Sequence, residues 1–188
     1  MNARVIETIE ELEAFMGTVD DALAVPRDAG EFMHAMILCA GARRGLEIGT
    51  SYGYSGLWIA SALAEEGGTL TTIDHDQRKI DAARGNFERA GLSDHVRFKL
   101  GRALDVLPSL HGPFDFVLND ADKQHCVAYV ERLVDQLADR AIVLTDNTRT
   151  HPQELEAFVR WVRARPDFCS VDVPVGNGME LSVKRASR

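Results

Sequence analysis

The sequence predicts an α/β fold: a doubly wound, mostly parallel seven-stranded sheet that ends in a C-terminal antiparallel hairpin. Two observations predict it. Apolar segments of strand length alternate with longer segments of helical period, which is typical of a parallel sheet covered by helices on both faces. After the last helical segment, two strand-like runs follow with only a short connection between them, and such a connection permits only an antiparallel pair.

Two amphipathic helices are expected before the first strand, over Val5–Met16 and Asp28–Ala40. In the second, Phe32, Met33, Met36 and Ile37 share one face, which we expect to lie on a core. A chain of 188 residues with 45% hydrophobic content can bury one good core but is too short for two ordinary domains. We therefore expect a single domain over residues 1–188, with helices in 1–43 and an α/β core in 44–188.

The expected core alternates strands with helices. Its parallel strands are predicted at Gly45–Gly49, Thr69–Asp74, Val96–Gly101, Phe114–Asp120 and Ala141–Asp146. The helices between and after them are predicted at Tyr54–Ala64, Gln77–Ala90, Lys123–Leu137 and Pro152–Ala164. The hairpin consists of Cys169–Val175 and Met179–Lys184, joined through Gly176-Asn177-Gly178, where Asn-Gly is a favoured turn dipeptide.

The composition narrows the class of protein. A net charge of -8, with the basic residues scattered, disfavours nucleic acid as a partner. The N-terminus has no secretory pattern and no stretch approaches a membrane span, so we expect a cytoplasmic protein without a membrane partner. Cys39, Cys126 and Cys169 show no CxxC spacing, which predicts neither a disulfide framework nor a zinc knuckle; we expect buried thiols.

A glycine-containing turn follows the first predicted strand and leads into a helix. This end of a parallel sheet binds ligands, because the turn exposes backbone N–H groups at a helix N-terminus. Gly49 and Gly53 are spaced GxxxG, not GxGxxG, which disfavours a nicotinamide or flavin dinucleotide. Asp74, at the end of the second strand, can accept hydrogen bonds from both ribose hydroxyls, so a nucleoside ligand is indicated. The alternatives are an ordinary tight turn and a helix-capping Asp74.

Polar side chains also follow the fourth and fifth predicted strands. Asp120 ends the fourth, and Asp146 and Asn147 end the fifth. Adjacent parallel strands place their carboxyl ends side by side, so these side chains can converge. Two carboxylates and an amide oxygen suit Mg²⁺, Mn²⁺ or Ca²⁺ and leave coordination positions open. The alternative is helix capping by each Asp and a common Asp-Asn turn.

Five segments together resemble the catechol and caffeoyl-coenzyme A O-methyltransferase family in order and spacing: LEIGTSYGYS, TTIDHD, VRFKLGRALDVLP, FDFVLNDADK and VLTDN. The resemblance covers about Asp28 to Lys184 and includes the hairpin PVGNGMELSVK. It implies the class I fold of S-adenosylmethionine-dependent methyltransferases, with the N-terminal helices on the acceptor side. It also implies an enzyme that methylates a hydroxyl of a catechol-like small molecule with a divalent metal, Mg²⁺ being the expected ion.

The resemblance further implies the site residues. The cofactor-binding residues would be Glu47, Gly49, Thr50, Tyr52, Gly53, Ser55, Asp74, His75, Arg102, Ala103 and Asp120. Among them, Ser55 would hold the methionine carboxylate, Asp74 the ribose, and Arg102 and Ala103 would border the adenine. The metal ligands would be Asp120, Asp146 and Asn147.

Lys123 would be the general base. It lies at the start of a predicted helix, where the helix dipole and a nearby dication favour the neutral amine. A surface lysine is the alternative. The expected partner is an aromatic vicinal diol, because two adjacent oxygens can chelate a cation, and a homodimer is compatible with the resemblance. Glu180 either contacts the second hydroxyl of the substrate or forms a salt bridge on the hairpin.

The sequence is also compatible with other functions. A non-catalytic or regulatory S-adenosylmethionine-binding protein would need the cofactor turn but not the metal ligands. A methyltransferase for another small acceptor would work without metal, so activity in a chelator would identify it. Enzymes that methylate nitrogen often carry an Asn/Asp-Pro-Pro-aromatic run after the fourth strand, where this chain has Asp-Ala-Asp-Lys.

Overall fold

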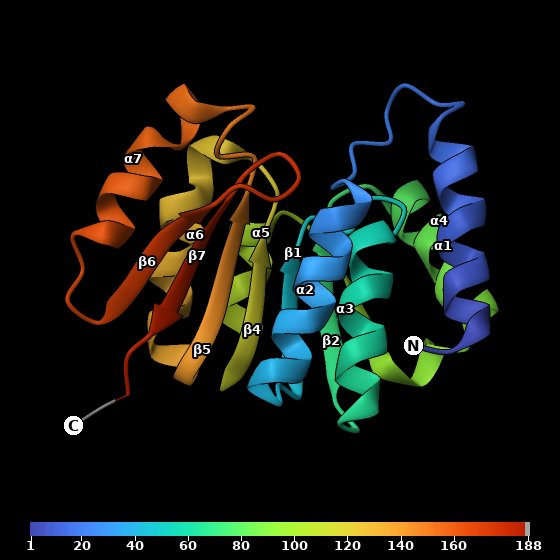
Figure 1. The fold of residues 1–188 in the computed structure, drawn as a ribbon, viewed down its shortest axis with the longest axis horizontal. Helices are drawn as coiled ribbons and strands as arrows, with labels where there is room; N and C mark the ends of the chain where they lie inside the picture. Colours follow the sequence, from blue (N-terminus) through green and yellow to red (C-terminus); the bar gives the residue numbers. More distant parts are fainter. Residues whose placement is uncertain (187–188) are drawn as a thin grey trace.

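The computed structural model of the protein describes residues 1–186, built around one seven-stranded sheet (Figure 1). In chain order the strands are β1 Arg44–Ile48, β2 Thr69–Asp74, β3 Val96–Leu100, β4 Phe114–Asn119, β5 Leu137–Asp146, β6 Phe168–Val173 and β7 Met179–Lys184. Their order in the sheet is β3-β2-β1-β4-β5-β7-β6. β1 to β5 are parallel, and β7 runs antiparallel to both β5 and β6. The predicted sheet and its terminal hairpin are confirmed.

Helices cover both faces of this sheet and enclose two cores. The first core involves α1 Ala3–Met16, α2 Arg27–Ala40, α3 Tyr54–Glu65 and α4 Gln77–Arg89. The second involves α5 Ala103–Val106, α6 Cys126–Leu133 and α7 Pro152–Arg163. Along β4, Phe116 and Leu118 enter the first core and Val117 enters the second, as the two-residue period of a strand requires.

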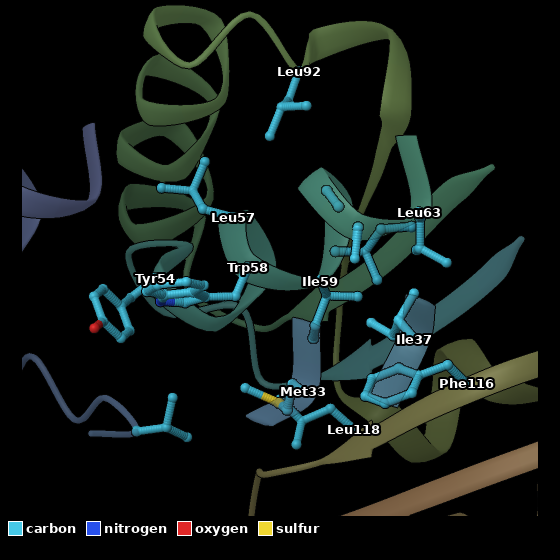
Figure 2. Close-up of a cluster of buried hydrophobic side chains, with 14 of the residues drawn as sticks. Met33, Ile37, Tyr54, Leu57, Trp58, Ile59, Leu63, Leu92, Phe116 and Leu118 are labelled. Atoms are coloured by element: carbon cyan, nitrogen blue, oxygen red, sulfur yellow. The ribbon is translucent and has the colours of Figure 1, made fainter. Parts of the chain in front are cut away.

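α3 is the most deeply buried helix described, with an unbroken buried run from Tyr54 to Leu63. Figure 2 shows its side chains among Met33 and Ile37 of α2 and Phe116 of β4. The helix begins directly after the glycine-containing turn that follows β1, residues 49–53, which is called the cofactor turn below. Burial on all sides therefore fixes the direction in which the helix N-terminus faces the ligand end of the sheet.

The predicted helix Lys123–Leu137 was wrong at both ends. A 3₁₀ turn occupies Lys123–His125 and a second occupies Val134–Gln136, so α6 spans only Cys126–Leu133. β5 instead begins at Leu137, which pairs with Phe114, and an irregularity in register absorbs the polar residues that follow. The polar residues between the predicted helix and the predicted strand Ala141–Asp146 therefore lie inside β5, at an irregularity of its pairing with β4. The short helix α5 was not predicted.

The prediction of buried thiols was wrong for two cysteines. Cys126 is buried, but Cys39 and Cys169 are exposed, and all three are free. Cys39 lies on the outer face of α2 and Cys169 on the edge strand β6, where no further layer covers them. Among the helices of residues 1–186, none is both long and apolar enough to cross a membrane.

Candidate active site

A cavity of about 910 Å³ opens at the carboxyl ends of β1, β2, β4 and β5. β1 and β4 are neighbours in the sheet, but the helices that follow them enter opposite cores, so the chain diverges at this point. Such a switch point leaves a crevice in which α/β proteins bind ligands. Part of the cavity wall comes from the N-terminal segment at Met16 and residues 22–24.

The turn after β1 is fixed by close backbone contacts. The N–H groups of Gly49 and Thr50 both donate to Ile73 O, at 3.0 and 3.2 Å. Gly49 has φ +106°, and a Cβ there would collide with the backbone oxygen of Asp120. Glycine is therefore required because the ends of β1 and β4 approach each other so closely.

Asp74 holds the same turn from the end of β2. Its Oδ2 accepts from Ser51 N at 2.8 Å and its Oδ1 accepts from Asp76 N at 2.9 Å. The cap of α4 is Asp76, whose carboxylate accepts from Arg78 N at 2.9 Å. Asp74 thus does not cap the next helix, and its carboxylate lines the cavity.

Glu47 lies beneath this turn and is 0% exposed. Ser55 Oγ donates to its Oε1 and Thr72 Oγ1 donates to its Oε2, each at 2.6 Å. Burial raises the pKa of Glu47 to about 8, against the hydrogen bonds from the two hydroxyls. The side chain is therefore a buried, neutral acid at pH 7.

A second polar group gathers beyond β4 and β5. Lys123 Nζ donates to Asp120 Oδ1 at 2.6 Å. Asp146 is 1% exposed, and its Oδ1 is buried without a hydrogen-bond partner among the described residues. Burial, together with the negative charge of Asp120, raises the pKa of Asp146 to about 7. Burial also raises the pKa of Asp120, although Lys123 opposes that shift. Two carboxyl groups thus share a poorly solvated space with one amine.

Asn147 completes this group from a left-handed backbone conformation, with φ +74°. Its Nδ2 donates to Thr150 Oγ1 at 3.1 Å, so the amide oxygen is the atom left for a ligand. Within residues 1–186 there is no metal-binding cluster of three or more His, Cys, Asp or Glu side chains. The candidate ligand set is instead two carboxylates and an amide.

Most of the residues predicted from the sequence line this one cavity. They are Gly49, Thr50, Tyr52, Ser55, Asp74, His75, Arg102, Ala103, Asp120, Lys123, Asp146 and Asn147. Glu47 and Gly53 do not line it. Glu47 is buried behind the turn, and Gly53 packs where a Cβ would lie 3.1 Å from both Ala83 and Phe87 of α4.

Several cavity residues were missed. Asn177 of the hairpin loop and Leu23 of the N-terminal segment line the cavity, as do the half-buried His125 and the exposed His151. The N-terminal segment is held on the cofactor turn because Tyr52 Oη donates to Asp21 Oδ1 at 2.9 Å. Gly-Asn-Gly is a signal for a turn, and nothing in it indicates a ligand.

Glu180 lies outside the cavity. It is 1% exposed and accepts two hydrogen bonds from the Arg163 guanidinium, each at 2.7 Å. Of the two roles considered for it, the structure shows the salt bridge.

The comparison with known proteins agrees with this geometry. The sequence profile of the O-methyltransferase family matches residues 3–185. A catechol O-methyltransferase of Mycobacterium tuberculosis is 40% identical over 133 residues, which cover 68% of this chain but only 60% of that protein. Caffeoyl-CoA O-methyltransferase 2 of Petunia hybrida is 32% identical over 178 residues, covering 82% of this chain and 73% of that protein.

Solved structures confirm the expected class I methyltransferase fold. An O-methyltransferase from Bacillus cereus, determined in complex with SAH, superposes with a TM-score of 0.86 at 30% identity and covers 95% of this chain and 91% of its own. Fold, motif order and sequence likeness thus agree over almost the whole chain, and the protein belongs to the O-methyltransferase family of enzymes.

Proposed function

We propose that the protein transfers a methyl group from S-adenosylmethionine to one hydroxyl of a catechol-like small molecule, assisted by a divalent cation. The observation that carries the proposal is that one cavity contains both groups of residues. The glycine turn at Gly49 lies at one end, and the carboxyl groups of Asp120 and Asp146 lie at the other, beside Lys123. The names of the catechol and caffeoyl-CoA relatives support the acceptor class.

The residues present fit a divalent cation. Asp146 Oδ1 is a buried acceptor without a partner among residues 1–186, and burial, together with a second carboxyl group, raises the pKa of Asp146. Such an atom is costly to bury unless a cation or a proton compensates it. Asp120, Asp146 and Asn147 would hold the ion, with Mg²⁺ the expected species. When bound, the cation would stabilise the oxyanion of the acceptor and orient its second oxygen.

The remaining steps fall to the chain itself. S-adenosylmethionine supplies a methyl group on a sulfonium centre, which an oxygen nucleophile can attack. A phenolic hydroxyl has a pKa of about 10, so it must lose its proton to react efficiently at neutral pH. The neutral amine of Lys123 accepts that proton, and the resulting ammonium stays paired with Asp120 Oδ1, which lies 2.6 Å from Nζ. The turn and Asp74 orient the nucleoside, which makes positioning a major source of the rate.

The proposal is tested with 3,4-dihydroxybenzoate as acceptor, in Mg²⁺ and after chelation. We expect methylation only with the metal. Asp146→Ala should abolish turnover but keep S-adenosylmethionine binding. Asp122→Asn is the matched control, because Asp122 is an exposed carboxylate of the same cavity that contacts His125 instead.

Three outcomes would contradict the proposal in different ways. Full activity in chelator would identify a metal-independent methyltransferase. Cofactor binding without methyl transfer to any hydroxyl acceptor would identify a binding protein. Loss of cofactor affinity in Asp146→Ala would show that Asp146 belongs to the nucleoside site.

A further inference from the structure

A chain of hydroxyl groups lies beneath the cofactor turn, and the mechanism above does not use it. Ser55 Oγ and Thr72 Oγ1 each lie 2.6 Å from a carboxyl oxygen of Glu47, and Thr72 Oγ1 also lies 2.5 Å from Thr50 Oγ1. Glu47 and Thr72 are 0% exposed. The two ends of the chain, Ser55 and Thr50, line the cavity. Hydroxyl groups therefore connect the buried carboxyl group to two residues that line the cavity.

The direction of these hydrogen bonds depends on whether Glu47 is ionised. When Glu47 is ionised, its oxygens can only accept, so Ser55 and Thr72 each give it their proton. Thr72 then has none left, and Thr50 must donate to Thr72. The hydroxyl groups of Ser55 and Thr50 can then accept a hydrogen bond from a ligand in the cavity but cannot donate one. A neutral Glu47 adds one proton to the same three bonds, and one hydroxyl proton is released to the cavity, at Ser55 or at Thr50.

We propose that Glu47 is a positioning residue: in its neutral form it turns one hydroxyl proton of Ser55 or Thr50 toward the carboxylate of the bound cofactor. This inference rests on the proposed function, because the carboxylate is that of the methionine portion. Ser55 lies in the first turn of α3, where the helix N-terminus already favours an anion. A hydrogen bond from a hydroxyl to a carboxylate is worth about tenfold to a hundredfold in affinity.

The surroundings of Glu47 keep it neutral near pH 7. The titratable groups that face it are Asp74 at the end of β2 and Asp120 after β4, and both are acidic. From α3 it meets Ser55 and Gly56, and Phe87 of α4 packs against Gly56. No ion pair to Glu47 forms within the described part of the chain. Its ionisation therefore depends on pH and on what occupies the cavity.

The variant Glu47→Gln separates this role from simple packing. The amide oxygen accepts from one hydroxyl, and the amide nitrogen always donates to the other, so glutamine copies the neutral acid at every pH. Calorimetry should compare the affinity for SAH of wild type and Glu47→Gln from about pH 7 to about pH 9. The second ligand is 5′-methylthioadenosine, which lacks the carboxylate.

We expect the wild type to lose about tenfold in SAH affinity relative to Glu47→Gln over this range, with no difference for 5′-methylthioadenosine. A second variant, Thr72→Val, keeps the volume but removes one donor to the carboxylate, so it should move the wild-type transition to higher pH. It also decides the matter if Glu47→Gln does not fold.

Parallel pH profiles for SAH in wild type and Glu47→Gln would overturn this inference, as would an equal change with 5′-methylthioadenosine or an unshifted Thr72→Val. In those cases SAH still binds at neutral pH and the proposed function stands. A wild type that fails to bind SAH near pH 7 would overturn both.

Discussion

The two ends of the cavity differ in how far the folded chain satisfies its own polar atoms. At the cofactor end, Asp74 accepts two backbone N–H groups and Glu47 accepts two hydroxyls. At the other end, Asp146 Oδ1 is buried without a partner among residues 1–186. Buried polar atoms in folded proteins are nearly always paired, so the second end is the exception.

This difference separates a preorganised site from one that needs a ligand. The cofactor turn takes its shape from contacts within the chain, so a nucleoside meets groups already in place. Burial raises the pKa of both Asp120 and Asp146, and the negative charge of Asp120 raises that of Asp146 further, so an added positive charge would stabilise both carboxylates. Substitutions at the first end should therefore act on stability and cofactor affinity, and those at the second on cation binding and turnover.

The largest expected effect is a pH-dependent stability that originates at Glu47. Its folded pKa of about 8 lies above its usual 4.5, so the folded state holds a proton that the unfolded state releases. The resulting stabilisation is complete below pH 4.5 and is lost as the pH rises toward 8, by up to about 5 kcal/mol. Urea unfolding at several pH values should show this slope in wild type and a flatter one in Glu47→Gln. Equal slopes would mean that Glu47 titrates normally.

A smaller effect on stability is expected at Gly49, where the two ends of the cavity are in contact. Gly49→Ala places a Cβ against the Asp120 backbone oxygen at a positive φ, and should lower the free energy of unfolding by about 3 kcal/mol and weaken SAH binding. Gly67→Ala is the matched control, because Gly67 also has a positive φ of +68° but no atom within 4 Å of an added Cβ. It should cost about 1 kcal/mol. Equal losses in thermal unfolding would show that the contact with Asp120 has no consequence.

The smallest effect on stability is expected at the ion pair between Arg163 and Glu180 of the C-terminal hairpin, which lies outside the cavity. Arg163→Ala leaves the buried Glu180 without its partner and should lower the free energy of unfolding by about 2 kcal/mol. The exposed pair of Arg160 and Glu156 provides the control, and Arg160→Ala should cost less than about 0.5 kcal/mol. Turnover should be unchanged in both. A selective rise in KM for the acceptor in Arg163→Ala would place Glu180 in the substrate site.

The position of the strand tips at one edge of the sheet could be predicted from the sequence. Asp120, Asp146 and Asn147 interrupt apolar strands at their carboxyl ends, and parallel pairing alone brings such positions to one edge. The hairpin was equally predictable, because a connection of a few residues excludes a parallel crossover. In these cases local pattern and topology are sufficient.

What the sequence did not reveal depends on register and on distant contacts. Glu47 meets Thr72 because these two residues are paired in the β1 and β2 register, which no local pattern specifies. Asn177 and Leu23 reach the cavity from segments far away in the chain. The error at Leu137 has the same origin, since a bulge allows polar residues inside a strand that pairs with β4.

The most direct test of this account is a calorimetric titration of Mg²⁺ into the SAH-loaded protein, with wild type and Asp146→Asn compared. We predict one Mg²⁺ site in wild type, no such site in Asp146→Asn, and unchanged SAH binding in both. Equal Mg²⁺ binding by the two proteins would contradict the claim that the unpartnered carboxylate of Asp146 is a cation ligand.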